Sequence, residues 1–205
     1  MADDFRLTPS GWSSFYDAVA QRPPHDTLLK ALALFEGGPD RRRFAIDLGC
    51  GEGRDAREML RRGWCVLAID RESEAIRRLL ARTPDHQRKR LHTQVAAFEV
   101  LADLPACDLV NASYSLPFCA PGQFPALWRM IVAAIRPRGR FAGNLFGVRD
   151  GWADDATMTF HTRAQTEALL SGFKVEWLLE EERDGHTATG EPKHWHVFHI
   201  VAFKR

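Results

Sequence analysis

The chain has 205 residues, of which 45% are hydrophobic, and its formal net charge is +1 at pH 7. This length supports one well-formed hydrophobic core and does not require two domains. A charge so close to zero excludes a global basic field that would attract nucleic acid or an anionic membrane surface. Arginines do cluster locally, in a pattern typical of solvated helix faces and loops.

The cysteines and the N-terminus indicate the compartment. None of the four cysteines forms a Cys-x-x-Cys pair, so we expect reduced thiols and neither a disulfide framework nor a zinc site. The first residues, 1–4, are acidic and lack the apolar segment of a signal peptide. No apolar run is long enough to span a bilayer. We therefore expect a cytoplasmic protein that does not bind a membrane.

Residues 1–42 precede the first predicted strand and are too short to form a domain of their own. An aromatic segment contains Trp12 and Tyr16, which either belong to the core or close over the site as a lid. Apolar residues at helical spacing follow, and Gly37-Gly38-Pro39 predicts the end of that helix. We predict one domain, in which residues 1–42 form a cap segment on a core of residues 43–205.

The core is predicted as strands alternating with helices. The strands are expected at Arg43–Leu48, Trp64–Ile69, Leu91–Ala97, Cys107–Ser113, Arg140–Phe146, Phe173–Glu181 and His194–Phe203. Thr162 and Gln165 form the pattern of a capping box at the start of the last helix, after a loop at 147–161. This order predicts an α/β fold with a doubly wound, mostly parallel sheet of seven strands and helices on both faces. The last two strands have no helix between them, so they should pair antiparallel at the sheet edge.

In the sixth strand, four apolar residues alternate with polar ones and should share one face of the sheet. They are Phe173, Val175, Trp177 and Leu179.

A glycine-rich turn, Asp47-Leu48-Gly49-Cys50-Gly51-Glu52-Gly53, joins the first strand to a helix. Its glycines let the backbone approach a ligand where a Cβ would collide, and the turn presents free N–H groups at a helix start. Asp70 ends the next strand, so both features meet at the sheet edge where nucleotide-like cofactors bind. The Asp47 carboxylate would repel a pyrophosphate but attract a cationic amine or sulfonium. The turn therefore favours S-adenosylmethionine over a dinucleotide.

The glycine-rich turn resembles motif I of class I S-adenosylmethionine-dependent methyltransferases, and Asp70 resembles their acidic residue of motif two. The sequence at 107–113 is similar to the family's strand-four motif. Arg136-Pro137-Arg138-Gly139-Arg140 is similar to the turn before strand five, with Arg138 replacing the usual first glycine. Among subfamilies, the chain looks most like the small tellurite-resistance and thiopurine-methyltransferase-like enzymes. The resemblance implies a Rossmann-like fold with a reversed last strand, and methyl transfer by in-line displacement.

The resemblance also implies a role for each motif residue. Asp47 would favour the cofactor's amine, and Asp70 would accept both ribose hydroxyls. Gly49 and Gly51, with Cys50 between them, would let the backbone approach the methionine and ribose. The other implied positions are Arg71 beside the adenine, Ala97 and Phe98 at the adenine edge, and Ala112 and Ser113 at the methionine end.

Three further residues are candidates for cofactor binding or catalysis. Arg22 is either a surface arginine or a partner of the cofactor carboxylate through a charge-assisted bond. His161 and Tyr114 are candidate catalytic residues, since His161 has a pKa suited to base chemistry and Tyr114 follows strand four. His161 equally fits a loop or capping residue, and a thiolate or oxyanion acceptor would need no base.

The acceptor is predicted to be a small molecule such as a thiol or an oxyanion. Residues 111–114 lack the D/N-P-P-Y/F pattern of amino-methylating nucleic-acid enzymes, so we expect no nucleic-acid substrate. The three histidines of segment 194–199 lack a third ligand on one face, so we expect no metal. The open alternatives are RNA or protein methylation, a non-catalytic S-adenosylmethionine-binding protein, and a nicotinamide oxidoreductase. The sequence predicts no oligomeric state.

Overall fold

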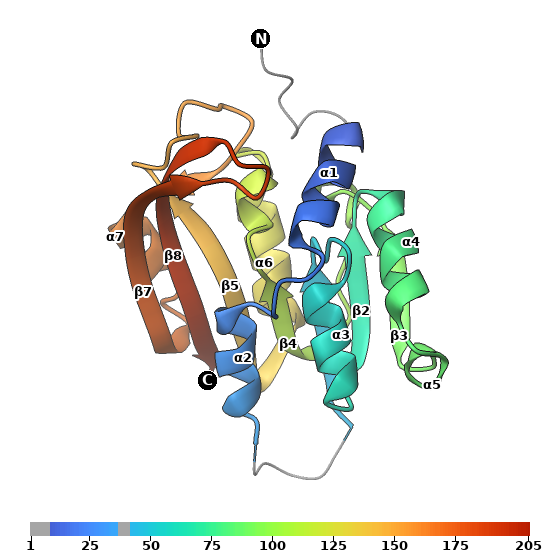
Figure 1. Cartoon of the computed structure of the whole chain (residues 1–205). Coiled ribbons are helices and arrows are strands. Elements are labelled where there is room, and N and C mark those ends of the chain that lie inside the picture. Colours follow the sequence, from blue (N-terminus) through green and yellow to red (C-terminus); the bar gives the residue numbers. More distant parts are fainter. Residues whose placement is uncertain (1–8, 37–41) are drawn as a thin grey trace.

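The fold is a single mixed sheet with helices on both faces, and the computed structural model describes residues 9–36 and 42–205 of it (Figure 1). The strands are β1 (Phe44–Leu48), β2 (Cys65–Asp70), β3 (Leu91–Val95), β4 (Cys107–Ala112), β5 (Ile135–Gly147), β6 (Phe160–His161), β7 (Phe173–His186) and β8 (Pro192–Lys204). They lie in the order β3-β2-β1-β4-β5-β8-β7, and the short β6 pairs with β5. The pairs among β1 to β5 are parallel, whereas β8 runs antiparallel to both β5 and β7. The predicted sheet and its reversed last strand are confirmed.

The helices cover the sheet in two layers (Figure 1). They are α1 (Pro9–Val19), α2 (Asp26–Ala33), α3 (Arg54–Arg61), α4 (Ser73–Arg82), α5 (Asp85–Arg88), α6 (Phe124–Ala134) and α7 (Arg163–Leu169), with 3-10 turns η2 (Phe98–Val100) and η3 (Leu116–Phe118). Apolar residues of α2, α3 and α4 form one core on the front face, and those of α6 form another behind. Successive β1 residues contribute to opposite cores, as a strand buried on both faces requires.

Several elements differ from the predicted ones. The aromatic cap segment is a helix, α1, and β6 lies within the predicted loop. β5 begins at Ile135, five residues early, because the chain leaving α6 already pairs with Cys107 and then bulges. Arg138 lies in this bulge with a φ of 68°, the left-handed conformation that glycine usually supplies. The predicted helix end at 37–39 lies outside the described residues.

The predicted alternation in β7 is wrong beyond its first residues. A register shift between Val175 and Trp177 rotates the following side chains by one position. As a result Leu178 packs against the core, whereas Leu179 is 46% exposed. A β-bulge of this kind depends on the partner strand, so the alternation within β7 could not reveal it.

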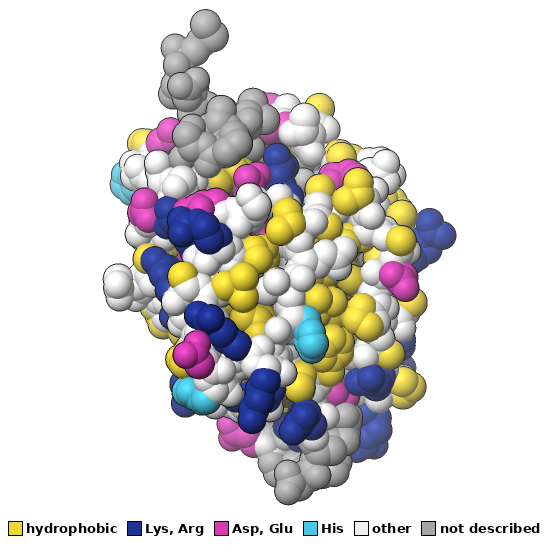
Figure 2. All heavy atoms as spheres, turned by 90° about the vertical axis from the view of Figure 1, so that its right-hand side faces the viewer, with side chains coloured by type: hydrophobic (Ala, Val, Ile, Leu, Met, Phe, Trp, Pro, Cys, Tyr) yellow, Lys and Arg dark blue, Asp and Glu magenta, His cyan; other side chains and the backbone are white. Residues whose placement is uncertain are grey.

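The arginines of α4 are paired with nearby acids. Figure 2 shows the face with α4 and β3, on which apolar side chains gather while basic and acidic ones lie scattered around them. On α4, Arg77 pairs with Glu74, and Arg78 pairs with both Glu74 and Asp17. These pairs leave this helix without an extended field of one sign.

None of the helices in the described ranges combines the length and apolar character that crossing a bilayer requires.

Replacing Thr162 with Ala should lower the free energy of unfolding by about 1 kcal/mol. Thr162 accepts a bond from the Gln165 N–H, and the Gln165 side chain accepts one from the Thr162 N–H, so the predicted capping box is confirmed. Urea unfolding of Thr162→Ala, with Thr162→Ser as the variant that keeps the hydroxyl, measures this. Equal losses in the two variants would contradict the capping role.

Candidate functional site

A cavity of about 350 Å³ lies at the carboxyl ends of the parallel strands. Its floor is the glycine-rich turn after β1, and residues that end or follow β2, β3, β4 and β5 form its walls. Helix α1 lines it from one side, and the β7–β8 hairpin lines it from another. The cavity therefore lies where doubly wound sheets bind their ligands.

The cavity brings together all but one of the residues that the sequence proposed for the cofactor. Those that line it are Arg22, Asp47, Gly49, Cys50, Gly51, Asp70, Arg71, Ala97, Phe98 and Ser113. Ala112 is not among the lining residues, because its side chain is fully buried in the core behind the strand. Tyr114 also lines the cavity, whereas His161 does not.

The three glycines of the turn have different partners. All three have positive φ, so the turn's conformation itself favours glycine. A Cβ on Gly49 would collide with Ser115, and one on Gly53 would collide with Leu79. On Gly51 it would lie 3.5 Å from the Tyr16 ring, at ordinary contact distance. Gly49 and Gly53 are thus required by the protein's own packing, whereas a Cβ on Gly51 would meet only the Tyr16 ring, without a collision.

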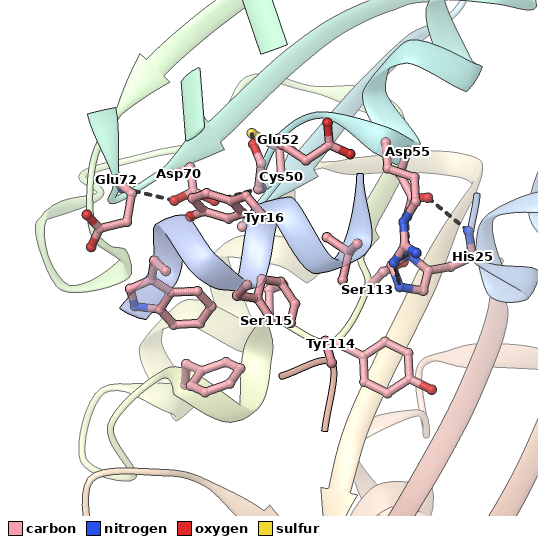
Figure 3. A pocket seen from close by; sticks show the side chains of 18 of the residues that line it. Tyr16, His25, Cys50, Glu52, Asp55, Asp70, Glu72, Ser113, Tyr114 and Ser115 are labelled. Atoms are coloured by element: carbon pink, nitrogen blue, oxygen red, sulfur yellow. Dashed lines mark hydrogen bonds and ion pairs between the residues drawn. The ribbon is translucent and has the colours of Figure 1, made fainter. Parts of the chain in front are cut away.

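Asp70 links the end of β2 to this turn. Its Oδ2 accepts the Gly51 N–H at 2.7 Å and its Oδ1 accepts the Glu72 N–H at 2.9 Å (Figure 3). Burial raises the pKa of Asp70, and these two hydrogen bonds oppose that rise. Each carboxylate oxygen retains a lone pair for a further donor. Asp70 is therefore held rigidly, with acceptor capacity left at the cavity wall.

A buried polar network surrounds Asp47. Asn111 donates to Asp47 Oδ1 at 2.8 Å and to Asp55 Oδ2 at 3.0 Å, so one amide bridges two carboxylates. Asp47 Oδ2 is buried and has no hydrogen-bond partner among the described residues. Burial, and then repulsion by Asp55, raises the pKa of Asp47 above its usual range. An orphaned oxygen of this kind fits a cationic donor from a ligand.

Asp55 is stabilised from the cap segment. His25 donates its backbone N–H to Asp55 at 2.9 Å, and its ring Nδ1 lies 2.9 Å from the same carboxylate (Figure 3). Burial opposes ionisation, but the charge and hydrogen bonds of His25 outweigh it and hold the pKa of Asp55 below its usual range. Neither residue was predicted from the sequence, because a histidine 30 positions from its partner leaves no local pattern.

Aromatic side chains of α1 close the cofactor half of the cavity. Tyr16 is 2% exposed, and its ring lies beside Asp70 and Cys50 in Figure 3. Burial and then the Asp70 charge raise the pKa of Tyr16, so its hydroxyl stays protonated. Trp12 stacks near Tyr16, with ring centroids 6.2 Å apart, and also lines the cavity. Tyr16 therefore fits both alternatives, since it is buried and also lines the cavity.

The other half of the cavity has aromatic walls. They are formed by Tyr114, Phe118, Phe146, Trp152 and Trp195. Tyr114 adopts a φ of 53°, which is strained for a bulky side chain, and its backbone N–H donates to the Asn144 side chain at 3.3 Å. Burial, and then the Glu181 charge, raises the pKa of Tyr114 to about 12. The sequence indicated Tyr114 but not Trp195, which reaches the site from a hairpin distant in the sequence.

His161 and the histidines of β8 do not line the cavity. The His161 ring packs 4.6 Å from the Phe124 ring, and burial lowers its pKa to about 4. His196 bonds to Glu180 and Arg149, and His199 bonds to Glu181 and Asn144. His196 and His199 are thus engaged in local hydrogen bonds to neighbouring residues.

Known proteins share this fold and part of this sequence. The profile of a family described as "Methyltransferase domain" matches residues 45–139, just under half of the chain. No curated protein matches the sequence. Among solved structures, TehB from Haemophilus influenzae is 13% identical with a TM-score of 0.75, and the match covers 93% of this chain and 66% of TehB.

Two further structures are similar over nearly their whole lengths. An S-adenosylmethionine-dependent methyltransferase from Mesorhizobium loti is 19% identical with a TM-score of 0.63, covering 87% of this chain and 98% of that one. A Burkholderia thailandensis 1,6-didemethyltoxoflavin-N1-methyltransferase, with bound 1,6-didemethyltoxoflavin and S-adenosylhomocysteine, is 21% identical with a TM-score of 0.61. That match covers 96% of this chain and 86% of the other. Residues 45–139 thus match a methyltransferase domain, and the chain as a whole has the Rossmann-like fold of S-adenosylmethionine-dependent methyltransferases.

Proposed function

We propose that the chain transfers a methyl group from S-adenosylmethionine to a small-molecule acceptor held between the aromatic walls. The observation that carries this proposal is the continuity of the cavity. A single hollow runs from the glycine turn and Asp70 to Tyr114 and Trp152. A cofactor at the turn and an acceptor between the aromatic rings would therefore be neighbours in a space shielded from water.

The residues present fit this cofactor. The orphaned Oδ2 of Asp47 suits its ammonium group, and the free lone pairs of Asp70 suit the ribose hydroxyls. Arg22, at the cavity wall, is suited to the carboxylate, and the Phe98 side chain to the adenine. When bound, the cofactor supplies an activated methyl group on a sulfonium.

The chain's own residues align the acceptor and exclude water. With a pKa near 12, the Tyr114 hydroxyl stays protonated at neutral pH and suits hydrogen-bond donation better than base chemistry. His161 lies outside the cavity lining, and we assign it no role in the reaction. An acceptor that reaches the site as a thiolate, or with an unprotonated lone pair, needs no base from the protein.

The alternatives are less well supported. Charged groups near Tyr114 have both signs, since Arg54 and Arg183 are offset by Asp26 and Glu181, and RNA would favour one basic groove. The loop after β5 contributes Trp152 to the wall and leaves the cavity open, whereas a non-catalytic protein could tolerate a filled site. We further propose that residues 1–205 act as one domain. The four free cysteines favour a cytoplasmic location.

The test combines binding and turnover. We expect calorimetry to detect S-adenosylhomocysteine binding and no binding of NAD. A panel of thiols, phenols and aromatic amines should release S-adenosylhomocysteine from S-adenosylmethionine with at least one acceptor. Binding of NAD with no affinity for S-adenosylhomocysteine would overturn the cofactor. Turnover with RNA or protein alone would overturn the acceptor class.

A further inference from the structure

A buried lysine lies behind the aromatic walls of the acceptor half. The Lys193 side chain is 1% exposed, and its Nζ lies 4.1 Å from the Trp152 ring centroid and 4.2 Å from that of Trp195. Phe146 is the third ring, at 5.2 Å. All three rings line the cavity, whereas Lys193 does not. The ammonium therefore contacts these rings from the side away from the cavity.

Asp150 completes this arrangement from further behind. Its carboxylate pairs with Lys193 Nζ and is itself fully buried. The carboxylate oxygens also accept the backbone N–H groups of Trp152 and His196, each at 3.1 Å. Asp150 is thereby tied to the backbone, and the ammonium that it pairs with is the group that contacts the rings. The ion pair presents its positive end to the wall.

This charge changes what the wall can bind. The face of an aromatic ring is negative and attracts cations. The Lys193 ammonium already lies over the Trp152 and Trp195 rings. A second cation stacked in the cavity would lie roughly 8 Å from the ammonium, which is about the screening length of physiological salt. Both charges would be in a largely desolvated place, where repulsion is stronger than in water. The Asp150 carboxylate paired with Lys193 attracts the second cation and offsets part of this repulsion, so the cation meets the positive end of a dipole. An uncharged or anionic ring meets no such repulsion.

The wall also restricts shape. The Trp152 and Trp195 rings are 5.9 Å apart and inclined by 58°, and Tyr114 meets Trp195 edge to face at 6.3 Å. Inclined rings at such spacings suit a flat guest that makes both face and edge contacts. At the rim, Arg183 bonds to Glu181 at 2.7 Å, so these two charges largely offset each other.

We propose that the acceptor site takes a flat aromatic molecule that is neutral or anionic and rejects a cationic one, and that Lys193 determines this specificity. The inference rests on the proposed function, since it concerns the acceptor half of the same cavity. Lys193 acts through Trp152 and Trp195 and does not touch the acceptor.

The test compares three probes with the same ring: benzoate, benzyl alcohol and benzylammonium. Their affinities for the intact protein are measured by titration with ligand-observed NMR at pH 7. We expect benzoate and benzyl alcohol to bind at least about tenfold more tightly than benzylammonium. In the double variant Lys193→Met/Asp150→Asn, which removes both charges together, this ratio should fall at least about threefold. Lys193→Arg, which keeps the charge, should retain the preference.

The outcomes separate the two proposals. Equal binding of benzylammonium and benzyl alcohol by the wild type, or an unchanged ratio in the double variant, would overturn the role of Lys193. Failure of all three probes to bind would overturn the aromatic acceptor class. Calorimetry with S-adenosylhomocysteine on the same samples reports on the cofactor half alone, and we expect no change in the double variant. If that variant does not fold, benzylammonium binding as tightly as benzyl alcohol in the wild type or in Lys193→Arg still overturns the proposal.

Discussion

Asp47→Asn should weaken the binding of S-adenosylhomocysteine roughly tenfold to a hundredfold, the effect of losing a hydrogen bond to a charged group, about 1.5–3 kcal/mol. The reason is the orphaned Oδ2, which is buried at the cavity wall and suits an ammonium donor. Asn111 still bonds to the amide oxygen of the variant, so the network around it persists. Calorimetry of both proteins at pH 7 measures the change.

The same substitution should leave stability unchanged or increase it. Asp47 and Asp55 are buried carboxylates bridged by Asn111, and their repulsion contributes to the raised pKa of Asp47. A carboxyl whose pKa is raised on folding binds more protons in the folded state than in the unfolded one. Its contribution to stability is therefore lost as pH rises from about 4, the ordinary carboxyl value, towards neutrality. Thermal unfolding across this range should show that the wild type loses stability as pH rises and that Asp47→Asn loses less.

Asp108→Asn is the matched control for this prediction. Asp108 is as buried as Asp47 but accepts the Phe44 N–H and pairs with Arg136, away from the cavity. We expect it to lose stability and keep its affinity for S-adenosylhomocysteine, the reverse of Asp47→Asn. An Asp47→Asn protein that is less stable but binds normally would show that Asp47 is structural only.

If the Asp70 carboxylate accepts the ribose hydroxyls, Asp70→Ala should weaken the binding of S-adenosylhomocysteine by about 1.5–3 kcal/mol. The substitution also removes the acceptor of the Gly51 and Glu72 N–H groups, so some stability is lost with it. Affinity alone cannot separate these two effects. We therefore propose a cycle with 2′-deoxy-S-adenosylhomocysteine, which lacks one of the hydroxyls.

If Asp70 binds that hydroxyl, removing both partners should cost clearly less than the sum of the two single losses. Additive losses in calorimetry would instead mean that Asp70 only shapes the turn. Asp70→Asn serves as the intermediate variant, since its amide oxygen can still accept one of the two backbone N–H groups.

Much of the cofactor half followed from local patterns. A strand, a glycine-rich turn and a helix are contiguous in sequence, so residues 47–53 and Asp70 could be assigned to one edge of the sheet. Ala112 was misplaced among the candidates because strand alternation turns its side chain into the core. His161 could not be excluded from its sequence position either. Its residue type suits base chemistry, but in the fold it packs against Phe124 and burial lowers its pKa.

The sequence by itself determined the order of strands and helices and the reversed last strand, and it predicted S-adenosylmethionine as the cofactor, because each depends on short periodic patterns or on one contiguous turn. Only the tertiary structure brought the rings of the acceptor half together and added Trp195 to them. These rings come from the segment after β4, η3, β5, the loop after β5 and β8, segments that meet only when the sheet assembles. The Lys193–Asp150 pair behind those rings joins residues 43 positions apart, and burial and charge of that kind arise from packing alone.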